Sequence, residues 1–123
     1  MGQASPFKPI ALVVEDDFWQ REMAVTLLEE NGMGVIQCES AEAAMSVLQK
    51  MGRRIALMFT DVNLAGRMNG VQLAHFAKQR FASLHVIVTS GLSLSESLPV
   101  GALFFPKPWL PLDVLHEAER SRH

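Results

Sequence analysis

Residues 10–17 read IALVVEDD, five apolar residues followed directly by three acids. Three later stretches repeat the pattern of an apolar run that ends in a polar residue, namely 55–61 (IALMFTD), 85–90 (HVIVTS) and 102–107 (ALFFPK). Nearly continuous apolar runs of this length are typical of strands in a parallel sheet that is covered on both faces. The segments between them favour helices, and this alternation predicts an α/β domain with helices on both faces of one sheet.

Local signals place the individual elements. Asp17 and Gln20 have the spacing of a capping box, Ser40 can cap a second helix, Asn69 opens a third, and Pro111 suits the first turn of the last. The apolar face of the first helix is expected to comprise Met23, Ala24, Leu27 and Leu28. The predicted strands are 10–14, 34–38, 55–60, 85–89 and 102–105, and the first and last helices are predicted at about 18–31 and 111–120.

The connection 91–101 is the exception to this regular alternation. It is about the minimum length for a strand-to-strand crossover that includes a helix. Its serines compete for backbone hydrogen bonds, and Pro99 and Gly101 break a helix at its end. We therefore expect a fourth helix of one or two turns, or an irregular and mobile segment.

Composition narrows the class of protein. With 123 residues, the chain is expected to form one domain, 9–123, after a disordered leader, 1–8. A net charge of −2 gives no basic surface for direct nucleic-acid binding and no polybasic membrane patch. Cys38 is the single cysteine, which excludes an internal disulfide, and we expect it to be buried. No apolar stretch reaches the ~20 residues of a membrane span, so a soluble cytoplasmic protein is expected.

Polar residues follow four of the predicted strands, and parallel strands bring them to one edge of the sheet. Glu15, Asp16 and Asp61 offer carboxylate oxygens, which suit Mg²⁺ or a similar hard cation such as Mn²⁺. Asp61 can also act as a nucleophile that accepts a phosphoryl group, because carboxylates form aspartyl phosphates. Lys107 can neutralise charge on the transferred oxygens, and Ser90 can donate a hydrogen bond to one of them.

With these positions filled, the chain resembles the receiver domains of bacterial two-component response regulators over essentially its whole length. The matching segments are LVVEDD (12–17), FTDVNL (59–64), MNG (68–70), VTSG (88–91) and FPKP (105–108). The resemblance implies a flavodoxin-like, doubly wound α/β fold with a five-stranded parallel sheet in the order 2-1-3-4-5 and five helices.

The resemblance also implies metal-site roles for individual residues. Asp61 would be the phosphoacceptor and a metal ligand, and Asp16 would bind the metal directly. Glu15 would act through a water molecule, and Asn63 would offer its backbone carbonyl.

Further roles follow from the same resemblance. Ser90 and Lys107 would contact the phosphoryl group, as would the backbone of Gly91. Ser90 and Phe104 would form the conformational switch, and the Lys107–Pro108 peptide bond would be cis.

Three departures from the family pattern stand out. Ala65 replaces the usual proline, and the loop 65–67 carries one extra residue before the MNG segment. Glu15 replaces the commoner aspartate. Phe104 replaces tyrosine, which removes the phenolic hydrogen bond of the switch.

The resemblance implies a phosphorylation-controlled binding module, either stand-alone or part of a longer protein such as a hybrid kinase. The donor would be a histidine kinase or a histidine phosphotransfer protein, and the output would be a partner-binding surface, with a homodimer as one option. Its chemistry would be limited to self-catalysed phosphotransfer and autodephosphorylation, so it would not be an enzyme in the usual sense.

Three alternatives compete with this interpretation. A haloacid-dehalogenase-type phosphatase would need an acid where Asn63 stands, to serve as the general acid. A flavin-binding module would need a phosphate loop where residues 15–17 are acidic and would repel the phosphate. A degenerate receiver that is not phosphorylated is the third, although all of the chemical positions are filled.

Overall fold

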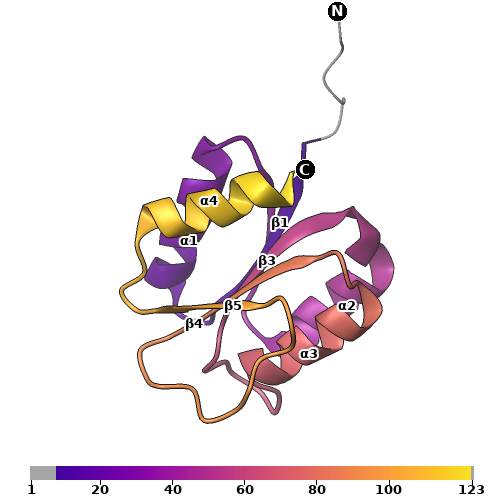
Figure 1. The fold of residues 1–123 in the computed structure, drawn as a ribbon, viewed down its shortest axis with the longest axis vertical. Coiled ribbons are helices and arrows are strands. Elements are labelled where there is room, and N and C mark those ends of the chain that lie inside the picture. The colour runs from indigo at the N-terminus through magenta and orange to yellow at the C-terminus, as the bar shows by residue number, and fades with distance from the viewer. Residues whose placement is uncertain (1–7, 123) are drawn as a thin grey trace, which may run out of the picture.

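The computed structural model describes residues 8–122 and shows a five-stranded parallel sheet in the order β2-β1-β3-β4-β5 (Figure 1). This is the predicted order. The strands are β1 (Ile10–Val14), β2 (Gly34–Cys38), β3 (Ile55–Asp61), β4 (His85–Ser90) and β5 (Leu103–Pro106). The helices are α1 (Phe18–Glu30), α2 (Ala41–Met51), α3 (Gly70–Arg80) and α4 (Pro111–Ser121), with a short 3-10 helix at Gly52–Arg54.

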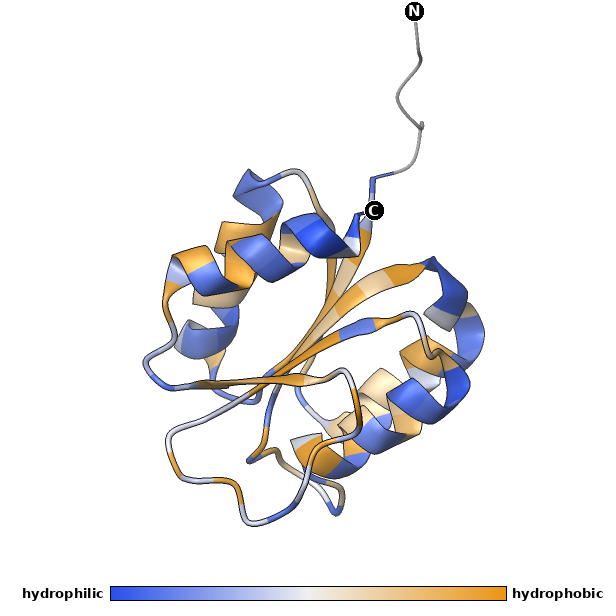
Figure 2. Ribbon diagram, viewed as in Figure 1, coloured by the Kyte–Doolittle hydropathy of each residue, from blue (hydrophilic) through white to orange (hydrophobic). Residues whose placement is uncertain are grey.

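Two apolar layers enclose the sheet. α1 and α4 cover one face, and α2 and α3 cover the other (Figure 1). Alternate strand residues point to opposite layers, so that Val13 and Phe59 pack towards α1 and α4 while Leu12 and Met58 pack towards α2 and α3. The central strands are apolar along most of their length (Figure 2), which is why the sheet is covered on both faces.

The first helix begins where predicted but is capped differently. Asp17 accepts a hydrogen bond from the amide of Gln20 at 3.0 Å, but the Gln20 side chain contacts Lys107 instead of returning to Asp17. The expected capping box is therefore only half formed. A reciprocal capping box is present at α3, where Asn69 and Gln72 each accept the other's amide at 2.9 Å.

The apolar face of α1 is narrower than predicted. Ala24 and Leu28 are fully buried, whereas Met23 is 63% exposed. Met23 contributes to a surface pocket and not to the core. Cys38 is buried, as expected.

The prediction of five helices is wrong by one, because no helix forms between β4 and β5 in the described chain. Residues 91–102 follow the irregular path that was the second option for this connection. Side-chain contacts with α3 hold it, with Asn69 Nδ2 donating to Glu96 Oε1 at 2.9 Å and His75 Nε2 lying 2.9 Å from the Ser97 carbonyl oxygen. These contacts tie the irregular segment to the N-terminal half of α3.

The expected leader lies almost entirely outside the described residues, of which Lys8 is the first and is exposed. Among the described residues, none of the helices is both long and apolar enough to span a bilayer.

Candidate functional site at the carboxyl edge of the sheet

Three acids meet at the carboxyl edge, where the sequence predicted them. Asp61 is the last residue of β3 and Glu15 directly follows β1, and both are buried, with 5% and 3% of their surface exposed. Asp16 is exposed beside them. One carboxylate oxygen from each of these residues lies within 4.8 Å of the others. Adjacent parallel strands bring acids that are distant in the sequence to one site.

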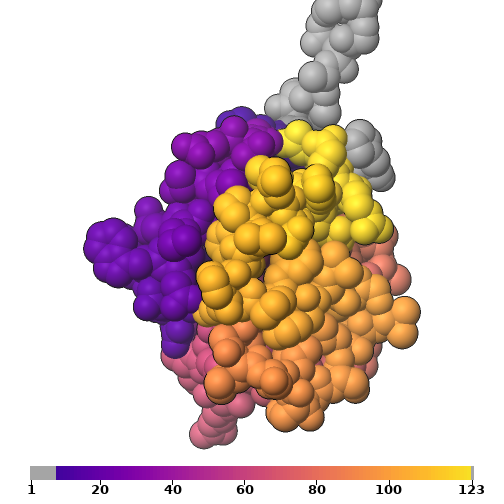
Figure 3. Space-filling view, turned by 60° about the vertical axis from the view of Figure 1, so that its left-hand side comes forward, coloured from indigo at the N-terminus to yellow at the C-terminus, as the bar shows by residue number. Residues whose placement is uncertain are grey.

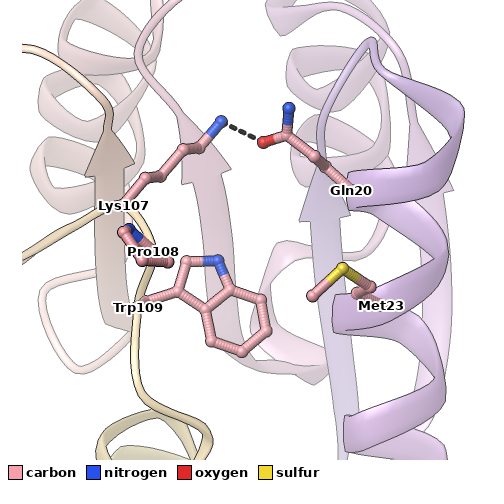
Figure 4. A pocket seen from close by; sticks show the side chains of 5 residues that line it. All are labelled: Gln20, Met23, Lys107, Pro108 and Trp109. Atoms are coloured by element: carbon pink, nitrogen blue, oxygen red, sulfur yellow. Dashed lines mark hydrogen bonds between the residues drawn. The ribbon is translucent and has the colours of Figure 1, made fainter.

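Lys107 reaches into this acidic cluster from the end of β5. Its Nζ lies 3.1 Å from Asp61 Oδ1 and 3.2 Å from Glu15 Oε1, and it also donates a hydrogen bond to Gln20 Oε1. The side chains of Lys107 and Gln20 point towards each other across the edge of a pocket (Figure 4). The Lys107–Pro108 peptide bond is cis, as the resemblance implied.

Burial of the acids opposes their ionisation. It raises the pKa of Asp61 above its ordinary value, and the charge of Asp16 adds to the increase, while Lys107 opposes it. Burial likewise raises the pKa of Glu15, with a further contribution from Asp61, against the opposing effects of the Asp17 amide and Lys107. The single ammonium of Lys107 therefore does not fully compensate for the two buried acids.

Two buried side-chain oxygens between residues 8 and 122 have no hydrogen-bond partner, and both lie at this edge. They are Asp61 Oδ1 and Thr89 Oγ1, on register partners of β3 and β4. The Lys107 ammonium is at ion-pair distance from Asp61 Oδ1 but does not form a well-oriented hydrogen bond with it. A buried oxygen with an unused lone pair beside two further carboxylates fits a divalent cation with oxygen ligands.

The backbone after Asp61 is fixed by close contacts. The Val62 amide donates to the Thr89 carbonyl oxygen at 2.9 Å, and the Gly70 amide donates to the Val62 carbonyl oxygen at 2.8 Å. A Cβ at Gly70 would lie 1.9 Å from the Asp61 carbonyl oxygen, so only glycine allows α3 to start here. Asn63 is exposed on the loop immediately beyond.

The remaining predicted residues lie at the ends of β4 and β5. Ser90 is buried, its Oγ accepts a hydrogen bond from the Leu92 amide at 3.0 Å, and its carbonyl oxygen accepts one from the Lys107 amide at 2.9 Å. Gly91 is exposed just beyond it. Phe104 pairs with Val88 in register and packs half-buried against the core layer next to α2 and α3.

A pocket of about 390 Å³ adjoins Lys107 on the side of α1. Met23 and Gln20 line it from α1, and Pro108 and Trp109 line it from the segment before α4 (Figure 4). The Trp109 ring meets Phe59 edge-on with its centroid 5.4 Å away, which anchors this segment to the sheet. Phe18, Trp19, Leu110 and Leu112, which are near the pocket-lining residues in the sequence, are also exposed.

Comparison with known proteins identifies the family. Residues 11–108 match the family model of the response regulator receiver domain. The chain belongs to this family.

Solved receiver structures share the fold over almost the whole chain. A response regulator receiver protein from Sinorhizobium medicae WSM419 superposes with a TM-score of 0.82 at 19% identity, covering 92% of this chain and 93% of that one. The receiver domain from the hybrid histidine kinase CckA gives 0.78 at 24% identity, covering 93% and 99%. A response regulator receiver protein from Pseudomonas putida gives 0.78 at 27% identity, covering 94% and 99%.

The structure adds two residues to the predicted site of this receiver domain. Thr89 contributes an unpartnered buried oxygen, and its polar side chain next to the end of an apolar strand was a signal that could have been used. Gln20 contacts Lys107, but its spacing from Asp17 suggested a capping role instead. Local capping patterns carry no information about a partner 87 residues away.

Proposed function

We propose that this receiver domain accepts a phosphoryl group onto Asp61 from a phosphohistidine of a histidine kinase or a histidine phosphotransfer protein. The observation that carries the proposal is the buried Asp61 carboxylate, whose Oδ1 has no hydrogen bond although an ammonium and two further acids lie around it. The phosphorus–nitrogen bond of the donor breaks as a bond forms from an Asp61 oxygen to phosphorus. The imidazole nitrogen leaves with the electron pair of that broken bond and then takes up a proton.

The metal would be Mg²⁺ or Mn²⁺. Asp16 and Asp61 would bind it directly, the backbone carbonyl of Asn63 would be a further ligand, and Glu15 would act through water. When bound, the cation neutralises charge on the phosphoryl oxygens. The acids of this chain suit that role, because one oxygen from each of Glu15, Asp16 and Asp61 lies within 4.8 Å of the others, and Asp61 Oδ1 has no hydrogen bond.

The other residues position and report the phosphoryl group. Lys107 would move its ammonium from the acids to a phosphoryl oxygen, and Ser90 and the Gly91 amide would donate hydrogen bonds. For this, Ser90 Oγ would turn its hydroxyl proton outwards while it keeps the Leu92 amide as a donor. With Phe104 as the second switch residue, the bound group would shift the domain between two states that differ in partner affinity.

The apolar surface beside the site supports a protein donor. Trp19 is 75% exposed at the start of α1, and Leu110 and Leu112 are exposed where α4 begins. α1 and the segment leading into α4 lie side by side on the face shown in Figure 3 and share a pocket. Exposed apolar side chains on two adjoining segments are typical of a docking surface. Such a donor would place the domain in the cytoplasm.

Labelling with acetyl phosphate and Mg²⁺ tests the proposal. Intact mass should show the gain of one phosphoryl group, hydroxylamine should remove it, and Asp61→Asn should abolish it. Asp16→Asn should weaken labelling through loss of metal binding, and Glu117→Gln, a buried acid distant from the site, should label normally. Persistence of the label in the Asp61→Asn protein would show that Asp61 is not the acceptor.

A further inference from the structure

The loop between β3 and α3 contacts the start of α2. Residues 65–67 hold the extra residue of this loop, and Ala65 forms an isolated parallel bridge with Ser40, the residue that caps α2. Gly66 has a φ of 98°, in the left-handed region that favours glycine. The loop therefore packs against the N-terminal end of α2.

Glu42, in that first turn, holds the loop. Its Oε2 accepts hydrogen bonds from the amides of Arg67 at 3.1 Å and Met68 at 3.2 Å. A Cβ at Gly66 would lie 2.6 Å from Glu42 Oε1, so the loop backbone fits closely around this carboxylate. The backbone amide of Glu42 itself, followed by those of Arg67 and Met68, lowers the pKa of Glu42, so it is a charged acceptor at neutral pH.

The two ends of the loop are fixed by different partners. At the start, Val62 is hydrogen-bonded to β4, and at the end Asn69 Nδ2 donates to Glu96 Oε1 at 2.9 Å. Between them, Ala65 bridges to Ser40, and Glu42 holds the amides of Arg67 and Met68 just before Asn69. Asn63, whose carbonyl is the proposed metal ligand, lies between the anchor at Val62 and the anchor at Glu42.

We propose that Glu42 is a positioning residue for the metal site, acting through the two loop amides that it holds. By fixing residues 66–68 it restricts the conformations available to Asn63, so the carbonyl of Asn63 is oriented before the cation arrives. Hydrogen-bonded partners of metal ligands act in this way in other metal sites. This inference rests on the proposed metal-dependent function.

The alternative is that Glu42 acts only through its negative charge, which would attract any cation. The two roles predict different responses to an amide side chain. Glutamine keeps an oxygen that can accept both amide hydrogen bonds but has no charge. Glu39 provides a matched control, because it is an exposed acid three residues earlier with no hydrogen bond to the loop in the described structure.

The experiment measures Mn²⁺ affinity from the electron paramagnetic resonance signal of the free ion, without any phosphodonor. Glu42→Ala should weaken binding about 10-fold, the lower end of the effect of outer partners of metal ligands. Glu42→Gln should retain most of the affinity, and Glu39→Ala should bind as the wild type does. Hydrogen exchange should be faster at the Arg67 and Met68 amides in Glu42→Ala alone.

The outcomes separate this inference from the function on which it rests. Equal affinity of the wild type and Glu42→Ala would overturn the positioning role, as would equal losses in Glu42→Ala and Glu42→Gln, which would indicate charge alone. Acetyl phosphate labelling of the wild type, measured on the same samples, reports independently on the proposed function. If the wild type labels at Asp61 and the variants bind Mn²⁺ equally, only the role of Glu42 fails.

Discussion

Two buried carboxylates near opposite ends of β4 differ in how completely they are paired. Glu117 of α4 lies near the start of the strand, with Oε2 2.8 Å from His85 Nδ1 and Oε1 3.2 Å from Arg120 Nη1. Asp61 lies near the end of the strand, where Oδ1 has no hydrogen bond and shares one ammonium with Glu15 and Gln20. The two residues are almost equally buried, at 4% and 5% exposed. Both carboxylate oxygens of Glu117 are therefore used within the fold, whereas Asp61 has an oxygen left for the ligand proposed above.

The largest effect on stability is expected at Glu117, whose two carboxylate oxygens both have partners. Glu117→Ala should lower the free energy of unfolding by about 2 kcal/mol, because it removes a buried carboxylate whose two oxygens are paired with His85 and Arg120. Urea unfolding measures this loss, and Asp61 should still be labelled by acetyl phosphate. Glu117→Gln, which keeps the volume, should lose less.

Glu119 is the control for that prediction. Its side chain is 63% exposed, and its Oε1 lies 3.8 Å from Nη1 of Arg122, three residues further along the chain. Exposed pairs of this kind contribute roughly 0–1 kcal/mol. If Glu117→Ala is no more destabilising than Glu119→Ala, the two buried carboxylates do not differ as argued here.

Substitution of Asp61 should have the opposite effect on the free energy of unfolding. Asp61→Asn should raise the free energy of unfolding by about 1 kcal/mol at pH 7, because functional sites often retain unfavourable charges that a neutral residue relieves. Urea unfolding in the presence of EDTA gives the value without a contribution from bound metal. A loss of stability on this substitution would mean that Lys107 already compensates for the charge of Asp61.

The pH dependence of the free energy of unfolding should reflect the raised pKa values of Asp61 and Glu15. Between the ordinary pKa of an aspartate, 3.8, and the higher value in the fold, the native state binds more protons than the unfolded state. Protonation therefore removes the unfavourable charge in the wild type as the pH falls through the folded pKa. The advantage of Asp61→Asn should shrink from pH 7 to pH 4 in parallel urea titrations, and a constant or growing advantage would contradict the assignment.

The sequence predicted which polar residues would meet where the strands alone determine their positions. Glu15, Asp61, Ser90 and Lys107 come together because each follows or ends an apolar parallel strand, and such strands share one carboxyl edge. The strand order was likewise predicted correctly, through the family resemblance. The meeting of these four residues depends on apolar runs that short stretches of sequence contain.

The features that were missed depend on side-chain partners far away in the sequence. Gln20 contacts Lys107 instead of completing a cap, and Glu42 holds amides 25 and 26 residues further on. The path of residues 91–102 is set by contacts with Asn69 and His75, although the composition correctly indicated a poor helix. Local propensity cannot predict such contacts, because they exist only once the strands have been placed.

The smallest expected effect concerns the competition between Gln20 and Asp61 for the ammonium of Lys107. Gln20 takes one donor of the ammonium, which leaves less for Asp61 Oδ1. Gln20→Ala should therefore let Lys107 pair more closely with Asp61 and stabilise the charged carboxylate. Because alanine also has the higher helix propensity, a direct comparison with the wild type would confuse the two effects.

A double-mutant cycle with Asp61→Asn removes that ambiguity. Gln20→Ala should stabilise the protein more when Asp61 is present than when asparagine replaces it, with a coupling of about 0.5 kcal/mol, the lower end for residues that share a partner. The helix contribution of alanine is the same in both backgrounds and cancels. Urea unfolding of the four proteins at pH 7 in EDTA gives the coupling. A value of zero would mean that Gln20 binds Lys107 without drawing it away from Asp61, so the unpaired oxygen of Asp61 would have to be explained by the position of the strand alone.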